Sequence, residues 1–106
     1  MKHLSHCFAL LLAGCICVAS AQPFPSKPVR IVIGFPAGGP LDQHARLLSD
    51  RLQQVLGQPV LIDYKSGAGG TVGAQDVMKA APDGYTLMLA NTGVMVINPA
   101  VYSRLP

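Results

Sequence analysis

The sequence predicts an α/β fold built on a parallel sheet with flanking helices, and three observations support this class. Three short apolar runs are rich in β-branched residues, as buried strands are. The two segments between them carry apolar residues at helical spacing. The connections that leave the first two runs are rich in glycine. An order of strand, helix, strand, helix, strand implies right-handed crossovers, and therefore strands that run parallel to one another.

The first 21 residues have the pattern of an export signal rather than of this fold. Lys2 and the amino terminus are positive, the run from Cys7 to Val18 is apolar, and Ala19-Ser20-Ala21 has the small-x-small pattern of a signal peptidase site. The apolar run is shorter than the ~20 residues that a membrane-spanning helix needs. We therefore predict a signal peptide at residues 1–21 and a mature periplasmic chain that begins at Gln22.

A lipoprotein box offers an alternative cleavage site in the same segment. Leu12-Ala13-Gly14-Cys15 would place an acylated Cys15 at the new N-terminus and anchor the protein to a membrane. However, the apolar run continues through residues 16–18, where a lipoprotein normally begins a polar tether. Cleavage after Ala21 is the preferred interpretation, and both sites would leave the protein outside the inner membrane.

The composition after cleavage limits the classes of function. Removing 21 of the 106 residues leaves 85, which is enough for one small domain at most. All three cysteines are removed with the signal, so no disulfide is expected. The remaining seven Lys and Arg residues and five Asp residues give a net charge of +2 without a basic cluster. This distribution argues against nucleic acid as a partner.

The same segment is poor in side chains that catalyse reactions. It has no Glu, and its one histidine, His44, lies in a helical pattern where a surface or half-buried position is expected. No Gly-x-Ser-x-Gly motif presents a nucleophilic serine. No group of His, Cys or carboxylate residues has the spacing of a metal site. We therefore expect no enzyme activity, no cofactor and no bound metal.

The first predicted strand and helix follow a proline-rich leader. The β-branched run at residues 29–35 predicts a strand that is buried on both faces, and the turn at residues 36–40 ends it. A helix is predicted from Leu41 to Leu56, with Gly57 at its C-terminal end. The apolar face of this helix is expected to consist of Leu41, Ala45, Leu48, Leu52, Val55 and Leu56.

The remaining elements repeat this alternation. They are a strand at residues 60–64, a glycine-rich loop at 65–70, a helix at about 71–80, a Pro-Asp-Gly turn at 82–84, a strand at 85–90 and a polar break at 91–93. No domain-ending signal precedes Leu105-Pro106, and the predicted helices would cover more sheet than three strands supply. Residues 22–106 are therefore expected to form the N-terminal portion of a first lobe without the second lobe, as a fragment or a truncated product.

The two glycine-rich connections are the candidate binding site. One spans residues 35–42 and the other residues 67–71, and each precedes a predicted helix. The carboxyl ends of parallel strands meet at one edge of a sheet, where ligands bind. The first amides of a helix have no internal acceptor and favour anions. A pocket for an anion, built from main-chain amides, is therefore one hypothesis; tight turns that serve only helix packing are the other.

Both loops also have features of nucleotide-binding motifs. Gly34 and Gly39 have the spacing of a P-loop, but Pro40-Leu41 stands where Lys and Ser or Thr are required. The loop that begins at Gly67 resembles a dinucleotide fingerprint with one extra residue, but no acidic residue ends the next strand. Asp42 fits a first-turn carboxylate of the predicted helix with or without a ligand.

Several linked motifs resemble, in order, those of the Bug family of solute receptors. They are PSKPVRIV at residues 25–32, FPAGG at 35–39 with Asp42 and Ala45-Arg46, LGQPV at 56–60, GAGGTVGA at 67–74, KAAPDGYTL at 79–87, and Asn98-Pro99 with Tyr102 and Leu105-Pro106. Together they cover nearly the whole mature chain. One modest departure is Tyr64-Lys65-Ser66, where the family often has a stretch like Asn-Arg-Pro.

The resemblance implies part of one lobe of a type II periplasmic-binding-protein fold, in which two α/β lobes close on a small ligand, usually a carboxylate. By resemblance, the turn at residues 35–42 and the turn at residues 69–71 would hold the ligand carboxylate by main-chain amides and bridging waters, and Asn91-Thr92 after the third strand would line the same cleft. The ligand-binding residues implied in this way are Phe35, Ala37, Gly38, Gly39, Asp42, Gly69, Gly70, Thr71, Asn91 and Thr92.

The function that this resemblance implies is an extracytoplasmic receptor that captures a small organic carboxylate. The receptor would act as a monomer and present its ligand to the membrane permease of a tripartite tricarboxylate-type transporter. Two alternatives stay open at this point. One is a nucleotide-dependent oxidoreductase that uses the loop at Gly67, and the other is a non-functional truncated product.

Overall fold

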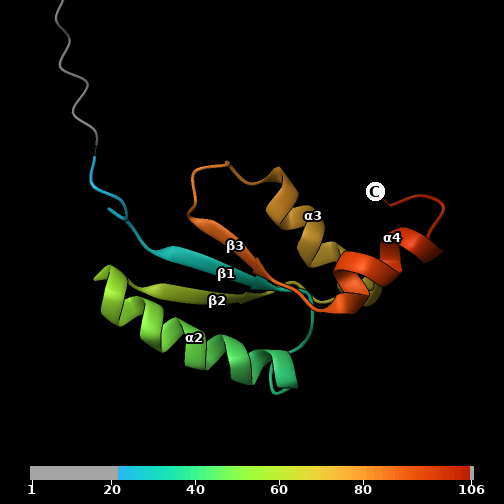
Figure 1. Ribbon diagram of the computed structural model, residues 1–106, viewed down its shortest axis with the longest axis horizontal. Helices are drawn as coiled ribbons and strands as arrows, with labels where there is room; N and C mark the ends of the chain where they lie inside the picture. The colour runs from blue at the N-terminus through green and yellow to red at the C-terminus, as the bar shows by residue number, and fades with distance from the viewer. Residues whose placement is uncertain (1–21, 106) are drawn as a thin grey trace, which may run out of the picture.

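The computed structural model describes residues 22–105, so the predicted signal peptide and its alternative lipoprotein site lie outside the described residues (Figure 1). The elements in chain order are β1 (Val29–Ile33), α2 (Pro40–Leu56), β2 (Val60–Tyr64), the 3-10 turn η1 (Ala68–Gly70), α3 (Thr71–Lys79), β3 (Thr86–Leu89), the π-helical turn η2 (Gly93–Ile97) and α4 (Asn98–Val101). Within this part of the chain no helix is long and apolar enough to cross a membrane.

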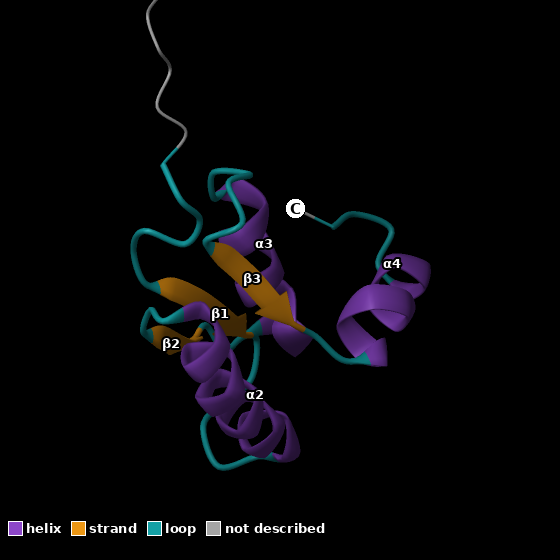
Figure 2. Cartoon of the chain, turned by 60° about the vertical axis from the view of Figure 1, so that its left-hand side comes forward, coloured by secondary structure: helices purple, strands orange, loops and turns teal. Residues whose placement is uncertain are grey.

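The three strands form one parallel sheet in the order β2-β1-β3, which confirms the predicted α/β class. The chain steps from β1 to β2 in one direction and then crosses back over β1 to reach β3. Right-handed crossovers in opposite directions place their helices on opposite faces of a sheet. Accordingly, α2 covers one face and α3 the other (Figures 1 and 2).

The central strand β1 forms the core, as its β-branched sequence predicts. Val29, Ile31, Val32 and Ile33 are each at most 2% exposed. The strand ends two residues earlier than predicted because Gly34 leaves the sheet and passes against the backbone of Gly70. The other observed bounds differ from the predicted ones by one residue at α2, α3 and β3 and agree at β2.

The buried face of α2 differs from the predicted one. Ala45 is fully buried, and Leu52 and Leu56 pack against the core as expected. However, Leu48 is 41% exposed and Val55 is 82% exposed, so the prediction was wrong for these two residues. The buried stripe is rotated toward Asp42 and Ser49, which have hydrogen-bond partners inside the protein.

An ion-pair cluster ties α3 to the sheet. Arg30 of β1 places Nη1 2.8 Å from the Oδ2 of Asp63 on β2 and 2.9 Å from the Oδ2 of Asp76 on α3. The hydrogen bond with Asp63 is the main cause that raises the pKa of Arg30, with Asp76 adding to it and burial opposing it. Lys65 Nζ lies 3.7 Å from Asp63. The cluster therefore connects the second half of α3 to β1 and β2.

Candidate ligand-binding site

The three strand-to-helix connections meet at one edge of the sheet, as the parallel order requires. The turn after β1, the loop after β2 and the segment after β3 all leave from the carboxyl ends of the strands (Figure 1). In the order β2-β1-β3, the direction of winding reverses between β1 and β3. Crevices at such reversal points are where open α/β sheets bind ligands.

A hollow of about 400 Å³ lies at this reversal point. Its lining residues come from the first turn, the start of α2 and the segment after β3: Phe35, Pro36, Gly39, Pro40, Leu41 and Asn91. Three of the residues expected at the site, Phe35, Gly39 and Asn91, are therefore brought together in one concave surface. Thr92 is not among the residues that line it.

Gly39 can present its backbone to the hollow without special conformational needs. It is the N-terminal cap of α2 with φ −81° and ψ 176°, which any residue adopts. A Cβ added there would meet only the carbonyl oxygen of Pro36, at 3.8 Å. Pro40 lacks an N–H, and the amides of Leu41 and Asp42 lie in the first turn, where no intrahelical acceptor exists. The positive end of the α2 dipole therefore faces this side of the turn.

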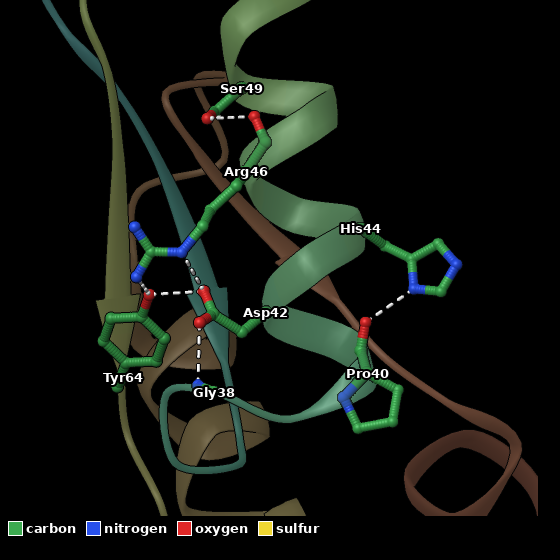
Figure 3. A network of polar contacts seen from close by, with 7 residues as sticks. All are labelled: Gly38, Pro40, Asp42, His44, Arg46, Ser49 and Tyr64. Carbon is green, nitrogen blue, oxygen red and sulfur yellow. Dashed lines mark hydrogen bonds and ion pairs between the residues drawn. The ribbon is translucent and has the colours of Figure 1, made fainter.

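Asp42 faces the protein interior, where three groups donate hydrogen bonds to its carboxylate (Figure 3). The Gly38 amide lies 2.7 Å from Oδ2. The Tyr64 hydroxyl lies 2.6 Å and the Arg46 Nε 2.9 Å from Oδ1. Asp42 lies in the first turn of α2, as the sequence analysis predicted. Its carboxylate stabilises the preceding turn by accepting the hydrogen bond of the Gly38 amide, which is therefore already used within the protein.

These contacts keep the Asp42 carboxylate ionised. The Tyr64 hydroxyl is the main cause that lowers the pKa of Asp42, the Gly38 amide and Arg46 add to it, and burial opposes them. The pKa of Tyr64 is raised, mainly by the same hydrogen bond. Because the pKa of Asp42 is lowered, this stabilisation is present above its unfolded pKa of about 3.9 and is lost as the pH falls through the folded pKa.

The second glycine turn is closed by a residue that the sequence analysis did not place at the site. Asn98 Nδ2 donates to the carbonyl oxygen of Gly69 at 3.0 Å and to Thr71 Oγ1 at 3.3 Å. Gly70 has φ +91°, and a Cβ there would lie 2.5 Å from Val94 Cγ2 and 3.1 Å from the Phe35 ring. Gly70 therefore allows close packing, which was the alternative explanation for the glycines. Through Gly70 the second glycine turn packs against Phe35 of the first turn.

Two further predicted residues have local structural roles. Asn91 Oδ1 accepts the Val94 amide at 3.1 Å and so begins η2. His44 is exposed, and its Nδ1 lies 2.6 Å from the carbonyl oxygen of Pro40 one helical turn earlier. Within the described residues, no group of three or more His, Cys, Asp or Glu side chains is placed to hold a metal ion.

Comparison with known proteins decides the family. The sequence profile described as "Tripartite tricarboxylate transporter family receptor" matches residues 44–106. The chain belongs to this receptor family. The chain is 45% identical over 97 residues to a UPF0065 protein of Bordetella bronchiseptica, covering 92% of this chain and 29% of that one. It is 42% identical over 80 residues to the protein BugT of Bordetella pertussis, covering 76% and 24%. The resemblance to the Bug family is thereby confirmed.

Solved receptor structures show the same arrangement of strands and helices. MatC from Rhodopseudomonas palustris, solved with malate, is 41% identical with a TM-score of 0.74, covering 77% of this chain and 28% of MatC. A second R. palustris protein, solved with adipate, is 38% identical with a TM-score of 0.65, covering 67% and 24%. The receptor chain thus spans less than a third of the length of these relatives. Because the family consists of solute-binding receptors, membership in it disfavours the oxidoreductase alternative.

Proposed function

We propose that this receptor chain forms part of the first lobe of an extracytoplasmic protein that binds a small organic carboxylate and delivers it to the permease of a tripartite tricarboxylate-type transporter. The observation that carries the proposal is the hollow at the β1/β3 reversal point, bounded by the glycine turn and the N-terminal end of α2. Malate and adipate in the two R. palustris structures support a carboxylate ligand. We propose that the receptor acts as a monomer.

The proposed site has two layers. Phe35, Gly39 and Asn91 line the hollow itself, and unpaired amides at the start of α2 would receive the ligand carboxylate. The remaining proposed residues would hold these groups in position around the ligand. They are Ala37, Gly38 and Asp42 in the first turn, Gly69, Gly70 and Thr71 in the second glycine turn, and Thr92 after β3.

A valine at Gly39 tests this site. In a receptor of the relatives' full length that carries this sequence, Gly39→Val should weaken malate binding about tenfold. The added bulk would cost one or two amide hydrogen bonds of about 0.5–1.5 kcal/mol each. The fold should persist, since Gly39 has φ −81° and open space around it. Calorimetry measures the affinity, with Val55→Ala at the far, exposed end of α2 as the control. Unchanged affinity in folded Gly39→Val would remove this turn from the site.

Export is proposed with cleavage after Ala21. Phe24 is the first aromatic side chain after the signal; its ring centroid lies 4.9 Å from that of Tyr85, so cleavage at Ala21 would spare this contact. Family relatives include a protein described as the periplasmic binding protein BugD, which supports a periplasmic location. N-terminal sequencing of the exported product should start at Gln22. A product that starts at acylated Cys15 would instead indicate a lipid-anchored receptor.

A further inference from the structure

A chain of hydrogen bonds connects the end of β2 to the turn after β1 (Figure 3). Tyr64 is the last residue of β2, and its hydroxyl donates to Asp42 Oδ1 at 2.6 Å. Arg46 Nη2 donates to the same hydroxyl at 3.1 Å, and Arg46 Nε donates to Asp42 Oδ1. The other carboxylate oxygen accepts the Gly38 amide. Both oxygens of Asp42 are therefore engaged within the protein.

Gly38 is a point of this turn where no side chain packs against the backbone. Gly38 has φ +88°, and a Cβ built on it would have no atom within 4 Å. The hydrogen bond to Asp42 is thus the contact that fixes the Gly38 amide. Asp42 has only 5% of its side chain exposed, so its orientation depends in turn on the groups that donate to it.

The same chain also controls charge beside the hollow. A free carboxylate in the first turn of α2 would repel an anionic ligand at the helix terminus, where the dipole otherwise attracts it. Arg46 pairs with Asp42 at 2.9 Å, and the Tyr64 hydroxyl turns the carboxylate inward. Among the described residues, Arg46 and Tyr64 are the ionisable side chains that contact Asp42. The ion pair of Asp42 and Arg46 therefore adds no net charge next to the hollow.

We propose that Tyr64, acting through Asp42, is a positioning residue that fixes the Gly38 turn and keeps the Asp42 charge away from the bound carboxylate. The inference rests on the proposed carboxylate-binding function.

The test replaces Tyr64 with phenylalanine in a receptor of the relatives' full length that carries this sequence. Tyr64→Phe removes one hydroxyl and keeps the ring. Calorimetry with malate at neutral pH should show an affinity about tenfold lower, because a turn that has lost this support would have to be ordered when the ligand binds. Tyr102→Phe is the matched control, because Tyr102 is 51% exposed and lies outside the network. It should bind malate like the unaltered receptor.

A second measurement reports the positioning directly. The NMR shift of the Gly38 amide proton should titrate with Asp42, since the two are hydrogen-bonded. In Tyr64→Phe the titration midpoint should move upward, because the largest cause of the lowered pKa of Asp42 is gone. A merely structural role of the tyrosine ring would leave this midpoint unchanged.

The outcomes separate this inference from the proposed function. Weaker malate binding together with a raised midpoint supports the inference. Unaltered affinity in Tyr64→Phe overturns it while leaving the receptor function in place. If the unaltered receptor binds none of a panel of small mono-, di- and tricarboxylates that includes malate and adipate, the proposed function fails. The titration midpoint of the Gly38 amide then tests the positioning role by itself: a rise in Tyr64→Phe supports it, and no change refutes it. Should Tyr64→Phe not fold, Asp42→Asn replaces it, and a Gly38 titration that persists in Asp42→Asn refutes the inference.

Discussion

Replacing Gly34 with alanine is expected to destabilise the receptor by about 3 kcal/mol, at the upper end of the usual cost of overpacking. The added Cβ would lie 2.7 Å from both Cα and the carbonyl oxygen of Gly70. These are backbone atoms, so no side chain can rotate away. Gly73 closes the contact from the other side, where a Cβ would lie 2.9 Å from the Cα of Gly34. The end of β1 and the start of α3 would have to separate.

This separation would also disturb the binding site. Gly34 precedes Phe35, and Gly70 packs against the Phe35 ring, so both glycine turns would shift together. Urea unfolding of the full-length receptor measures the loss in stability. The matched control is Gly39→Ala, the same chemical change at a position where the nearest atom is 3.8 Å away. Equal stability of the two variants would show that the contact between β1 and α3 can relax at little cost.

Residues 22–106 produced alone are expected to show no measurable carboxylate binding at micromolar ligand. The resemblance to two-lobed receptors implies that the ligand is normally buried between lobes. On one lobe, water competes for each amide hydrogen bond, whose net contribution is about 0.5–1.5 kcal/mol. Micromolar affinity requires about 8 kcal/mol, which three or four such bonds do not easily reach.

The same product is expected to fold weakly or aggregate. A chain of 85 residues buries only about 60–65% of its unfolded surface. β3 is an edge strand, and the large apolar side chains of Met78, Met95 and Ile97 are each more than half exposed. Thermal unfolding with and without malate checks both statements. A cooperative transition that moves to higher temperature with a dicarboxylate would show that this part of the lobe is self-sufficient, and the prediction would be wrong.

The order and type of the elements could be predicted because each depends on local pattern. The β-branched run at 29–33 can be buried on both faces only as a central strand, and it forms one. Gly57 ends α2 with φ +65°, as a glycine at that position indicates. The orientation of α2 was less predictable. Asp42 and Ser49 have polar side chains that are buried only because they find hydrogen-bond partners. Asp42 bonds to Gly38 in the turn before the helix and to Tyr64 of β2, and Ser49 bonds to the carbonyl oxygen of Arg46.

By itself the sequence determined that parallel strands bring two glycine turns and the Asn91 segment to one edge of a sheet, because topology follows from the alternation of strand and helix. Only the tertiary structure decided what each glycine is for. Gly39 borders the open hollow, whereas Gly34, Gly70 and Gly73 allow backbones to touch. It also decided that Asp42 bonds to Tyr64, 22 residues away. Such roles depend on distances between segments that are remote in the sequence, and a local pattern carries no information about those distances.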